Sequence, residues 1–334
     1  MLKFAVVILN WNGEALLERY LPYVVKFSGD ADIYVADNAS TDDSVAFVKA
    51  NFPSVRIIQN TTNGGFSRGY NEALQHVRAD VYCLLNSDVE VTKNWLGPIR
   101  KLMEENPETA IVQPKILDLL NKDKFEYAGA AGGFLDQLGY PFCRGRIFQE
   151  LETDKGQYDD QTEIFWATGA CMFIRAGVFH ALSGFDEAYF AHQEEIDLCW
   201  RARNHGYKVF YTGFSSVYHL GGSTLSNMNP KKTYLNFRNS LYSITKSLPG
   251  KRVFLVLFLR LLLDLIAGLR FIFQGKTRHC IAIVKAHLSF YRNFRSMYRK
   301  RKNVTFARNY YKTTSIVWSY FVNQVGSFND LIKY

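Results

Sequence analysis

Cysteine is scarce in this sequence, and the cysteines that occur form no pattern. The 334 residues contain five, scattered along the chain without a CxxC pair. An odd, dispersed set of thiols argues against a disulfide framework and against a zinc site built from cysteine pairs. We therefore expect reduced thiols in a cytoplasmic protein.

The sequence also lacks a signal-peptide core and the composition of a disordered chain. The apolar run in MLKFAVVILNWNG is too short for a signal peptide and continues into a strand-like pattern, so we expect no export signal. Charged residues make up 21% and aromatic residues 15% of the chain, which excludes a disordered protein. A 48% share of hydrophobic residues is enough for a large core.

Acidic residues are nearly missing from the last third of the chain. Residues 1–230 contain 20 Lys and Arg against 29 Asp and Glu, whereas residues 231–334 contain 20 against 2. Two regions of opposite charge have different partners. We predict one domain over 1–230. Residues 231–334 then form a basic helical extension.

The segment VFLVLFLRLLLDLIAGLRFIF (253–273) is long enough to span a bilayer, but Arg260, Asp264 and Arg270 interrupt it. Arg260 and Asp264 are four residues apart and share one side of a helix, which leaves a broad apolar face. Because charges inside a bilayer are costly, we predict a helix that lies in the membrane interface. The alternatives are an ordinary helical region packed on the first domain and a surface that binds nucleic acid.

Five apolar, β-branched runs in the first 115 residues predict strands at 4–9, 33–36, 55–58, 81–85 and 110–113. Polar, helix-compatible stretches separate them, which indicates an α/β fold with a mostly parallel sheet covered on both faces. The Gly-rich, irregular pattern of residues 118–165 predicts loops with a short sheet extension. Further strands are predicted at 170–179 and 208–213, and a helix over 194–206 that Gly206 terminates.

Polar residues follow the predicted strands, where ligands of such sheets bind. Asp37 lies at a strand end, where its carboxylate could accept hydrogen bonds from a nucleobase. Asp88 follows a very apolar strand and suits a hard divalent cation, which takes one or two carboxylates beside phosphate oxygens; a plain Asp turn is the alternative. His219 ends a later strand and is a candidate imidazole ligand, although a single histidine is more often structural.

The segment NTTNGGFSRGYNEAL is a glycine loop that continues into a helix. Gly65 would let backbone amides approach a diphosphate, with Arg68 as a nearby positive charge. An ordinary turn with a glycine at positive φ is an equally good interpretation.

Three acids begin the predicted helix at 194. Glu194 and Asp197 share a face, and Asp197 could form an ion pair with Arg201 four residues later. Glu195 then remains free to face a cleft. Acids are common in a first helical turn, so a structural role is the default interpretation.

Taken together, the motifs resemble family 2 nucleotide-sugar glycosyltransferases of the GT-A fold, and among them the bacterial rhamnosyltransferase-like members. The matching segments cover roughly residues 4–242: VVILNWNG, VADNASTDDS, NGGFSRGYN, LLNSDVEVTKNWL, TGACMFIRAGVF, SGFDEAYFAHQEEIDLCWRARNHGYKVFYTGFSSVYHLGGST and FRNSLY. Jointly they are highly specific.

The resemblance implies a catalytic domain over 1–230, with a nucleotide half over about 1–115 and an acceptor half over about 116–230. It also implies roles for individual residues. Glu195 matches the catalytic base, and Asp88 and His219 match ligands of Mg²⁺ or Mn²⁺. The resemblance further implies nucleotide contacts by Asn10, Trp11, Asp37, Gly65, Arg68 and Asn86. It implies acceptor contacts by Trp166, Thr168, Gly169, Asp186 and Glu194.

Two positions depart from the family pattern. Asn86 replaces the first acid of the Asp-x-Asp motif, so the metal would depend on Asp88, His219 and the diphosphate. The base position holds Glu rather than Asp, which moves the carboxylate by one methylene.

The implied activity is a single displacement with inversion. A sugar would move from a dTDP- or UDP-activated donor, with rhamnose as the first candidate, to a glycan or polyprenyl-linked acceptor in surface polysaccharide synthesis. A lipid-linked acceptor favours an anionic membrane surface over nucleic acid as partner, at the inner face of the cell membrane. A non-catalytic nucleotide-sugar or glycan-binding relative is the alternative. An oxidoreductase is disfavoured because the glycine loop follows the third strand rather than the first.

Overall fold

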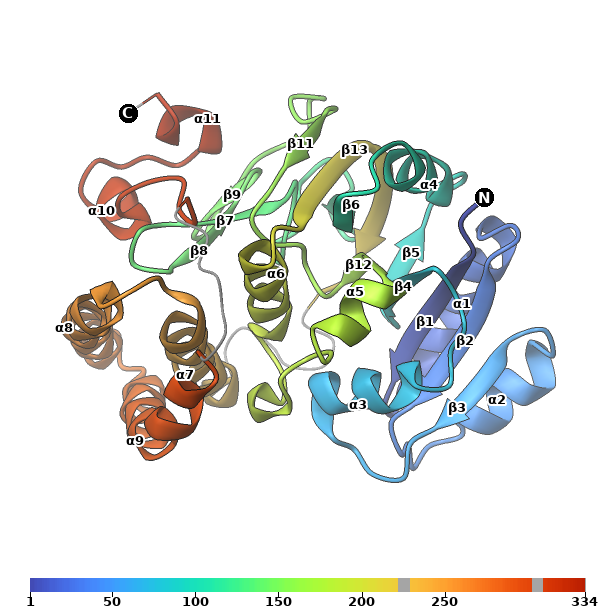
Figure 1. Ribbon diagram of the computed structural model, residues 1–334, viewed down its shortest axis with the longest axis horizontal. Helices are drawn as coiled ribbons and strands as arrows, with labels where there is room; N and C mark the ends of the chain where they lie inside the picture. Colours follow the sequence, from blue (N-terminus) through green and yellow to red (C-terminus); the bar gives the residue numbers. More distant parts are fainter. Residues whose placement is uncertain (222–228, 302–308, 334) are drawn as a thin grey trace.

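A nine-stranded sheet forms the centre of the structure, a computed structural model that describes residues 1–221, 229–301 and 309–333 (Figure 1). Most neighbouring strands in its N-terminal half are parallel, as the sequence predicts. In order across the sheet, the strands are β11 (Gln161–Glu163), β13 (Lys208–His219), β6 (Thr109–Asp118), β12 (Cys171–Arg175), β4 (Val81–Asn86), β1 (Phe4–Asn10), β2 (Asp32–Asp37) and β3 (Arg56–Gln59), while β5 (Val89–Val91) pairs with β13.

The two faces of this sheet are covered by different helices. Because side chains alternate along a strand, Phe4, Val6 and Ile8 of β1 point to one face and Ala5 and Val7 to the other. The helices α1 (Glu14–Phe27), α2 (Ser44–Asn51) and α4 (Leu96–Glu105) pack on the first face. The second face is covered by α3 (Gly65–Leu74), α5 (Ala176–Ala181) and α6 (Glu194–Asn204). The predicted α/β architecture with two covered faces is confirmed.

The predicted strand at 170–179 is too long. The strand β12 pairs antiparallel with β4 from Cys171 to Arg175, and Arg175 lies opposite Val81, the first residue of β4. No partner residue of β4 remains beyond that point, so the chain turns into α5. A short apolar run cannot be assigned to strand or helix from its sequence alone.

The irregular segment 118–165 contains a second sheet as well as the predicted extension of the first. The strand β11 extends the main sheet by pairing with β13. A separate antiparallel sheet of four strands consists of β7 (Gly133–Leu135), β8 (Pro141–Cys143), β9 (Arg146–Ile147) and β10 (Glu150–Leu151). The short helices α10 (Ile316–Phe321) and α11 (Phe328–Leu331) return to it, and the ring of Phe328 lies 5.2 Å from that of Phe134.

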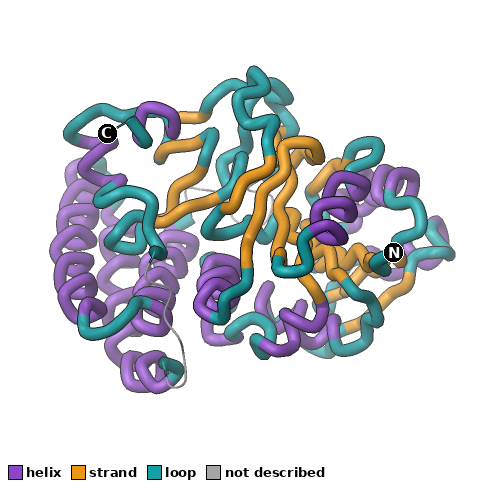
Figure 2. Tube along the Cα trace, turned by 45° about the horizontal axis from the view of Figure 1, so that its top comes forward, coloured by secondary structure: helices purple, strands orange, loops and turns teal. Residues whose placement is uncertain are grey.

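Three long helices form a layer beside α6, away from the N-terminal strands (Figures 1 and 2). They are α7 (Pro230–Ser247), α8 (Arg252–Phe273) and α9 (Thr277–Arg299). The Asn229 side chain caps α7 by accepting a hydrogen bond from the Lys231 amide, and Pro230 occupies the first turn. Ile244 and Val253 belong to the same buried cluster as the second face of the sheet. Within the described ranges, none of the helices combines the length and the hydropathy that crossing a bilayer requires.

Candidate active site

Polar side chains meet at the carboxyl edge of the parallel strands. Asn10 lies opposite Asp37 in the β1–β2 pair, and Leu9 lies opposite Asn86 in the β1–β4 pair. The Asn10 Nδ2 atom donates to Asp37 Oδ1 at 3.3 Å, and the Ser40 amide donates to Asp37 Oδ2 at 3.0 Å. Both side chains are buried, and these two hydrogen bonds hold them in place.

Trp11 differs from its neighbours because half of its surface is exposed. It follows β1 directly, and its exposed fraction is 50%. An exposed indole beside buried polar groups offers an aromatic surface to a ligand. The structure thus brings Asn10, Trp11, Asp37 and Asn86 to one edge, while their contacts with a nucleotide stay a prediction.

The start of α3 is tied to the loop that precedes α6. Gly65 has φ of +75°, and a Cβ atom at this position would lie 2.5 Å from the Phe190 carbonyl oxygen. The Phe66 and Ser67 amides donate to that oxygen at 2.8 and 3.3 Å. Gly65 is therefore required by a close approach of protein backbone, and these amides already have an acceptor.

Arg68, the other predicted diphosphate contact, lies one turn further along α3. Its guanidinium forms an ion pair with Glu72 at 2.6 Å on the surface. The predicted contacts of Gly65 and Arg68 with a diphosphate are not tested by this geometry.

Asp88 directly precedes β5, and His219 is the last residue of β13, beside it. The pairing of β5 with β13 places Val89 opposite His219, and the His219 Nε2 atom lies 3.1 Å from Asp88 Oδ1. The Glu126 carboxylate lies 3.4 Å from His219 Nδ1, and all three side chains are buried. Burial alone would lower the pKa of His219, but the two flanking carboxylates outweigh it and raise the pKa to about 10.

The donor atoms of this pair fit a divalent cation that takes most of its ligands from elsewhere. Mn²⁺ accepts carboxylate and neutral imidazole ligands, so a cation at Asp88 and His219 would have to displace the proton that the raised pKa keeps on the imidazole. Among the described residues no group of three or more such side chains has the arrangement of a complete metal site. A cation at this pair would therefore need oxygen atoms of a substrate or of water.

Sequence reasoning did not identify Glu126. It lies in an irregular segment 93 positions before His219, and its carboxylate also accepts a hydrogen bond from the Ala128 amide. No local pattern marks such a residue. Only the pairing of β13 with β6 brings the two together.

The loop before α6 has an unusual backbone. Phe190, His192 and Gln193 have φ values of 66°, 67° and 72°, in the left-handed region that side chains disfavour. Asn239 of α7 holds this loop, because its Nδ2 atom donates to the Tyr189, Ala191 and His192 carbonyls within 3.1 Å. Strained backbone of this kind concentrates at functional sites.

Arg238, the neighbour of Asn239, adds two more contacts to the loop. Its guanidinium donates to the carbonyls of Ala188 and Tyr189 at 3.1 and 3.0 Å. Both residues lie in the FRNSLY segment, for which the sequence suggested no role. Two neighbouring side chains of α7 thus fix the backbone that leads into α6.

The three acids of α6 have separate environments. Asp197 is fully buried and pairs with Arg201 at 2.8 Å, which confirms the predicted ion pair. Glu194 is buried with one carboxylate oxygen unpaired, and this burial, together with the nearby Glu195, raises its pKa well above the ordinary value. Glu195 is half-buried, and burial raises its pKa to about 7 although backbone amides oppose the shift. Burial and Glu195 therefore favour the protonated form of Glu194, whereas Glu195 is poised to gain or lose a proton.

The segment 166–169, predicted to contact an acceptor, packs behind α6. Trp166 is buried and its indole N–H donates to the Phe134 carbonyl at 3.0 Å, while Thr168 is buried with its amide bonded to Gln113. The Ala167 amide donates to Cys199 Sγ of α6 at 3.4 Å. These residues support the helix from behind, and direct acceptor contacts by Trp166, Thr168 and Gly169 stay a prediction.

Asp186, another predicted acceptor residue, lies in an ion-pair network. It precedes the short helix η1 (Glu187–Tyr189) and pairs with Lys246 of α7 at 2.6 Å and with Lys300 at 2.7 Å. Lys246 also lies 2.7 Å from Asp197. Burial alone would raise the pKa of Asp186, but the two ammonium groups lower it well below the ordinary value.

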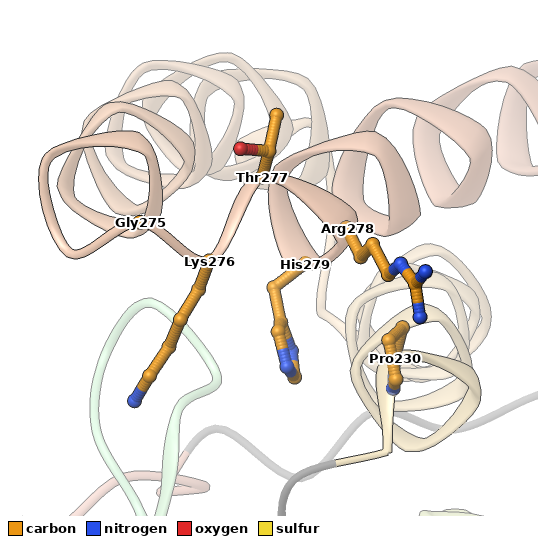
Figure 3. Close-up of a pocket in the computed structure, with 6 residues that line it drawn as sticks. All are labelled: Pro230, Gly275, Lys276, Thr277, Arg278 and His279. Atoms are coloured by element: carbon orange, nitrogen blue, oxygen red, sulfur yellow. The ribbon is translucent and has the colours of Figure 1, made fainter.

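A hollow of about 420 Å³ lies elsewhere, between the start of α7 and the turn that joins α8 to α9 (Figure 3). Its lining consists of Pro230, Gly275, Lys276, Thr277, Arg278 and His279. It contains none of the residues predicted for the site.

A family model describes more than half of the chain. The model is that of glycosyl transferase family 2, and it matches residues 5–182. A low-salt glycan biosynthesis hexosyltransferase of Haloferax volcanii is 24% identical over 255 residues, which cover 70% of this chain and 73% of the relative. An N-acetylglucosaminyl-diphospho-decaprenol L-rhamnosyltransferase of Mycobacterium tuberculosis is 23% identical over 233 residues, which cover 64% of this chain and 75% of the relative.

Solved structures share the fold at low identity. The structure of GalNAc-T7 with UDP, GalNAc and Mn²⁺ superposes with a TM-score of 0.58 at 18% identity, over 74% of this chain and 48% of the other. A mannosyltransferase from Pyrobaculum calidifontis in complex with GDP-Man and Mn²⁺ superposes with a TM-score of 0.53 at 13% identity, over 90% of this chain and 84% of the other. The chain thus spans about half the length of GalNAc-T7 and most of the archaeal enzyme. The predicted GT-A fold is confirmed.

The ion-pair network predicts a contrast between two lysines that contact the same carboxylate. The variant Lys246→Met should lower the free energy of unfolding by about 3 kcal/mol, because it leaves Asp186 and Asp197 with fewer compensating charges in a buried place. The variant Lys300→Met should lower it by less than about 1 kcal/mol, since Lys300 is 38% exposed. Urea unfolding at neutral pH measures both values.

The pH dependence of the same measurement provides a control. The lowered pKa of Asp186 stabilises the fold above the ordinary pKa of 3.8, and this contribution is lost as the pH falls below it. The deficit of Lys246→Met should therefore shrink in acid. Equal losses for the two variants would contradict the assignment of Lys246 as the central cation.

Proposed function

The chain belongs to glycosyl transferase family 2, and from that premise we propose that it transfers a sugar with inversion from a nucleoside diphosphate to an acceptor hydroxyl. The observation that carries the mechanism is Glu195, a half-buried carboxyl group in the first turn of α6 with a pKa raised to about 7. A general base works best when its pKa lies near the working pH. The loop that leads to Glu195 touches the start of α3 through the Phe190 carbonyl, so donor and acceptor halves meet there.

The proposed step is one displacement. The acceptor oxygen forms a bond to the anomeric carbon of the sugar while the bond from that carbon to the diphosphate breaks. The nucleoside diphosphate leaves with the electron pair, and the Glu195 carboxylate takes the acceptor proton. In the protonated form that its raised pKa favours, Glu194 is suited to donate a hydrogen bond to an acceptor oxygen.

Asp88 and His219 are the residues that would hold Mg²⁺ or Mn²⁺. A bound cation there would neutralise charge that develops on the leaving diphosphate. The GalNAc-T7 and mannosyltransferase structures both contain Mn²⁺, which supports Mn²⁺ as the first metal to test. Glu126 lies behind His219 and would orient the imidazole, as carboxylates behind metal-bound histidines do.

The donor and acceptor are proposed from the relatives. The mycobacterial relative is named as an L-rhamnosyltransferase that acts on a diphospho-decaprenol glycan, so dTDP-rhamnose is the first donor to test and a polyprenyl-linked glycan the first acceptor. UDP-sugars form the second set, because GalNAc-T7 binds UDP. Exposed Trp11 and buried Asp37 are the proposed nucleobase contacts.

The first prediction for catalysis compares two adjacent acids. The variant Glu195→Gln should slow transfer by roughly 100- to 10,000-fold, because Gln cannot accept a proton, while the dissociation constant of the donor stays unchanged. The variant Glu194→Gln should stay within a few-fold of the parent, since Gln resembles in size and hydrogen bonding the protonated Glu194 that the raised pKa favours. Product formation is measured by mass spectrometry and donor binding by calorimetry. A Glu195→Gln enzyme within a few-fold of the parent would exclude Glu195 as the base.

The second prediction concerns pH. Because burial raises the pKa of Glu195, its carboxylate form is lost as the pH falls below about 7. The ratio kcat/KM should therefore be flat above about pH 7 and fall roughly tenfold per pH unit below it. Donor binding, measured in parallel, separates this effect from weaker binding. A decline that begins only near 4.5, the ordinary value for Glu, would contradict the proposal.

The third prediction concerns the metal. The variant Asp88→Asn should abolish Mn²⁺-dependent binding of the nucleotide, and Glu126→Gln should weaken it by roughly 10- to 100-fold. The matched control is Glu90→Gln, which removes a carboxylate two residues after Asp88, on β5, where it pairs with Lys122. Calorimetric titration of UDP and dTDP with and without Mn²⁺ measures all three. Unchanged Mn²⁺ dependence in Asp88→Asn would remove this residue from the metal site.

A further inference from the structure

The helix α8 presents its apolar side to solvent. Ten large apolar side chains along it are exposed, among them Leu255 at 60%, Leu265 at 60% and Ile266 at 61%. They recur every three or four residues, so they form one continuous stripe: Phe254, Leu255, Phe258, Leu261, Leu262, Leu265, Ile266, Leu269, Ile272 and Phe273. A surface helix of a water-soluble domain has the opposite arrangement, with its apolar stripe toward the core.

The charged residues in the middle of α8 point into the protein. Arg260 and Asp264 are almost fully buried, and the Arg260 guanidinium lies 3.8 Å from the Tyr140 ring centroid and donates to Ser240. Asp264 accepts hydrogen bonds from the Tyr140 hydroxyl at 3.1 Å and pairs with His287 of α9 at 3.0 Å. The predicted apolar face thus exists, and the polar network on the other side fixes which way it points.

The neighbouring helix α9 continues the exposed surface. It runs back along α8, since the ring of Tyr298 near its end lies 5.8 Å from that of Phe254 near the start of α8. Its exposed apolar residues are Ile281, Val284, Leu288, Tyr291 and Tyr298, and exposed Lys285, Arg292, Arg295 and Arg299 lie among them. We call the exposed side chains of α8 and α9 the docking face. Figures 1 and 2 show both helices at the end of the molecule opposite the N-terminal strands.

The docking face has no negative charge. Residues 251–300 contain 11 Lys and Arg but only one acid, Asp264, which is buried. At the turn between the helices, Arg278 is exposed, whereas the His279 ring is buried and hydrogen-bonded to Thr233 of α7 beside the hollow of Figure 3. Arg270, at the end of α8, lies over the ring of Phe321, and this ring and Trp318 of α10 are also exposed.

We infer that the docking face lies on a lipid bilayer that contains anionic lipids, with α8 in the plane of the interface. An apolar stripe flanked by Lys and Arg has the composition of helices that insert into the headgroup region. A second copy of this chain would bring two cationic surfaces together. Nucleic acid would match the cations but leave the apolar stripe in water. This inference rests on the α8–α9 surface alone and is independent of the proposed sugar transfer.

Flotation of the full chain with vesicles tests the inference. The chain should float with vesicles of phosphatidylcholine mixed with phosphatidylglycerol, and binding should weaken as salt is added. The triple variant Leu255→Gln/Leu265→Gln/Ile266→Gln should bind on the order of 100-fold more weakly, because three exposed side chains no longer enter the apolar layer. Since these residues are exposed, the variant should keep the unfolding midpoint of the parent.

Two further variants separate the contributions. The variant Lys285→Gln/Arg292→Gln/Arg295→Gln should lose roughly tenfold or more on anionic vesicles and little on pure phosphatidylcholine. The matched control Leu120→Gln/Phe214→Gln removes exposed apolar side chains outside the docking face, at 72% and 61% exposure, and should bind like the parent.

Two outcomes would overturn the inference. One is absence of flotation of the folded parent chain with anionic vesicles. The other is a dimer in light scattering that the Leu255, Leu265 and Ile266 substitutions convert to monomer, without an effect on vesicle binding. The first result would exclude an anionic lipid surface, and the second would assign the docking face to a second copy of this chain.

Discussion

The ammonium group of Lys246 lies between the carboxylates of Asp186 and Asp197, and much of the proposed site depends on this contact. It joins α7 to the loop before α6 and to α6 itself. Asp197 also binds Arg201 and accepts a hydrogen bond from the Tyr189 hydroxyl, so both of its carboxylate oxygens have partners within the structure. Of the three acids that begin α6, this one is therefore structural, and the raised pKa of Glu195 belongs to a group that the network leaves out.

Contacts from α7 and α3 explain why the loop before α6 keeps its left-handed backbone. Three of its residues have left-handed backbone: Phe190, His192 and Gln193. Each would cost about 1–3 kcal/mol of folding free energy without compensating contacts. Asn239 supplies donors to three carbonyls of this loop, and the Phe190 carbonyl receives two amides from α3. Hydrogen bonds from α7 and from α3 thus offset the backbone strain of the loop. A loop fixed in this way delivers Glu195 to one position relative to the strand edge, as a preorganised base requires.

Local and periodic features of the molecule could be predicted from the sequence, whereas its long-range contacts could not. Strand periodicity placed Asn10, Asp37 and Asn86 at one edge, and helix periodicity paired Asp197 with Arg201. The partners Glu126, Asn239 and Lys246 are separated from the groups they hold by dozens of residues, and no pattern connects them. Burial was equally hidden: nothing in the sequence distinguishes the buried ring of Trp166 from the exposed ring of Trp11.

The orientation of α8 shows how the catalytic and basic regions are connected. Its sequence predicts an apolar face, but only the contacts of Arg260 and Asp264 with Tyr140, Ser240 and His287 turn this face outward. Between this helix pair and α6 lies α7, and Lys300 at the end of α9 reaches Asp186 directly. If the docking face rests on a bilayer, the loop before α6 has a fixed height above it. An acceptor anchored in the same bilayer would then meet Glu195 by diffusing in two dimensions, with part of its orientation already set.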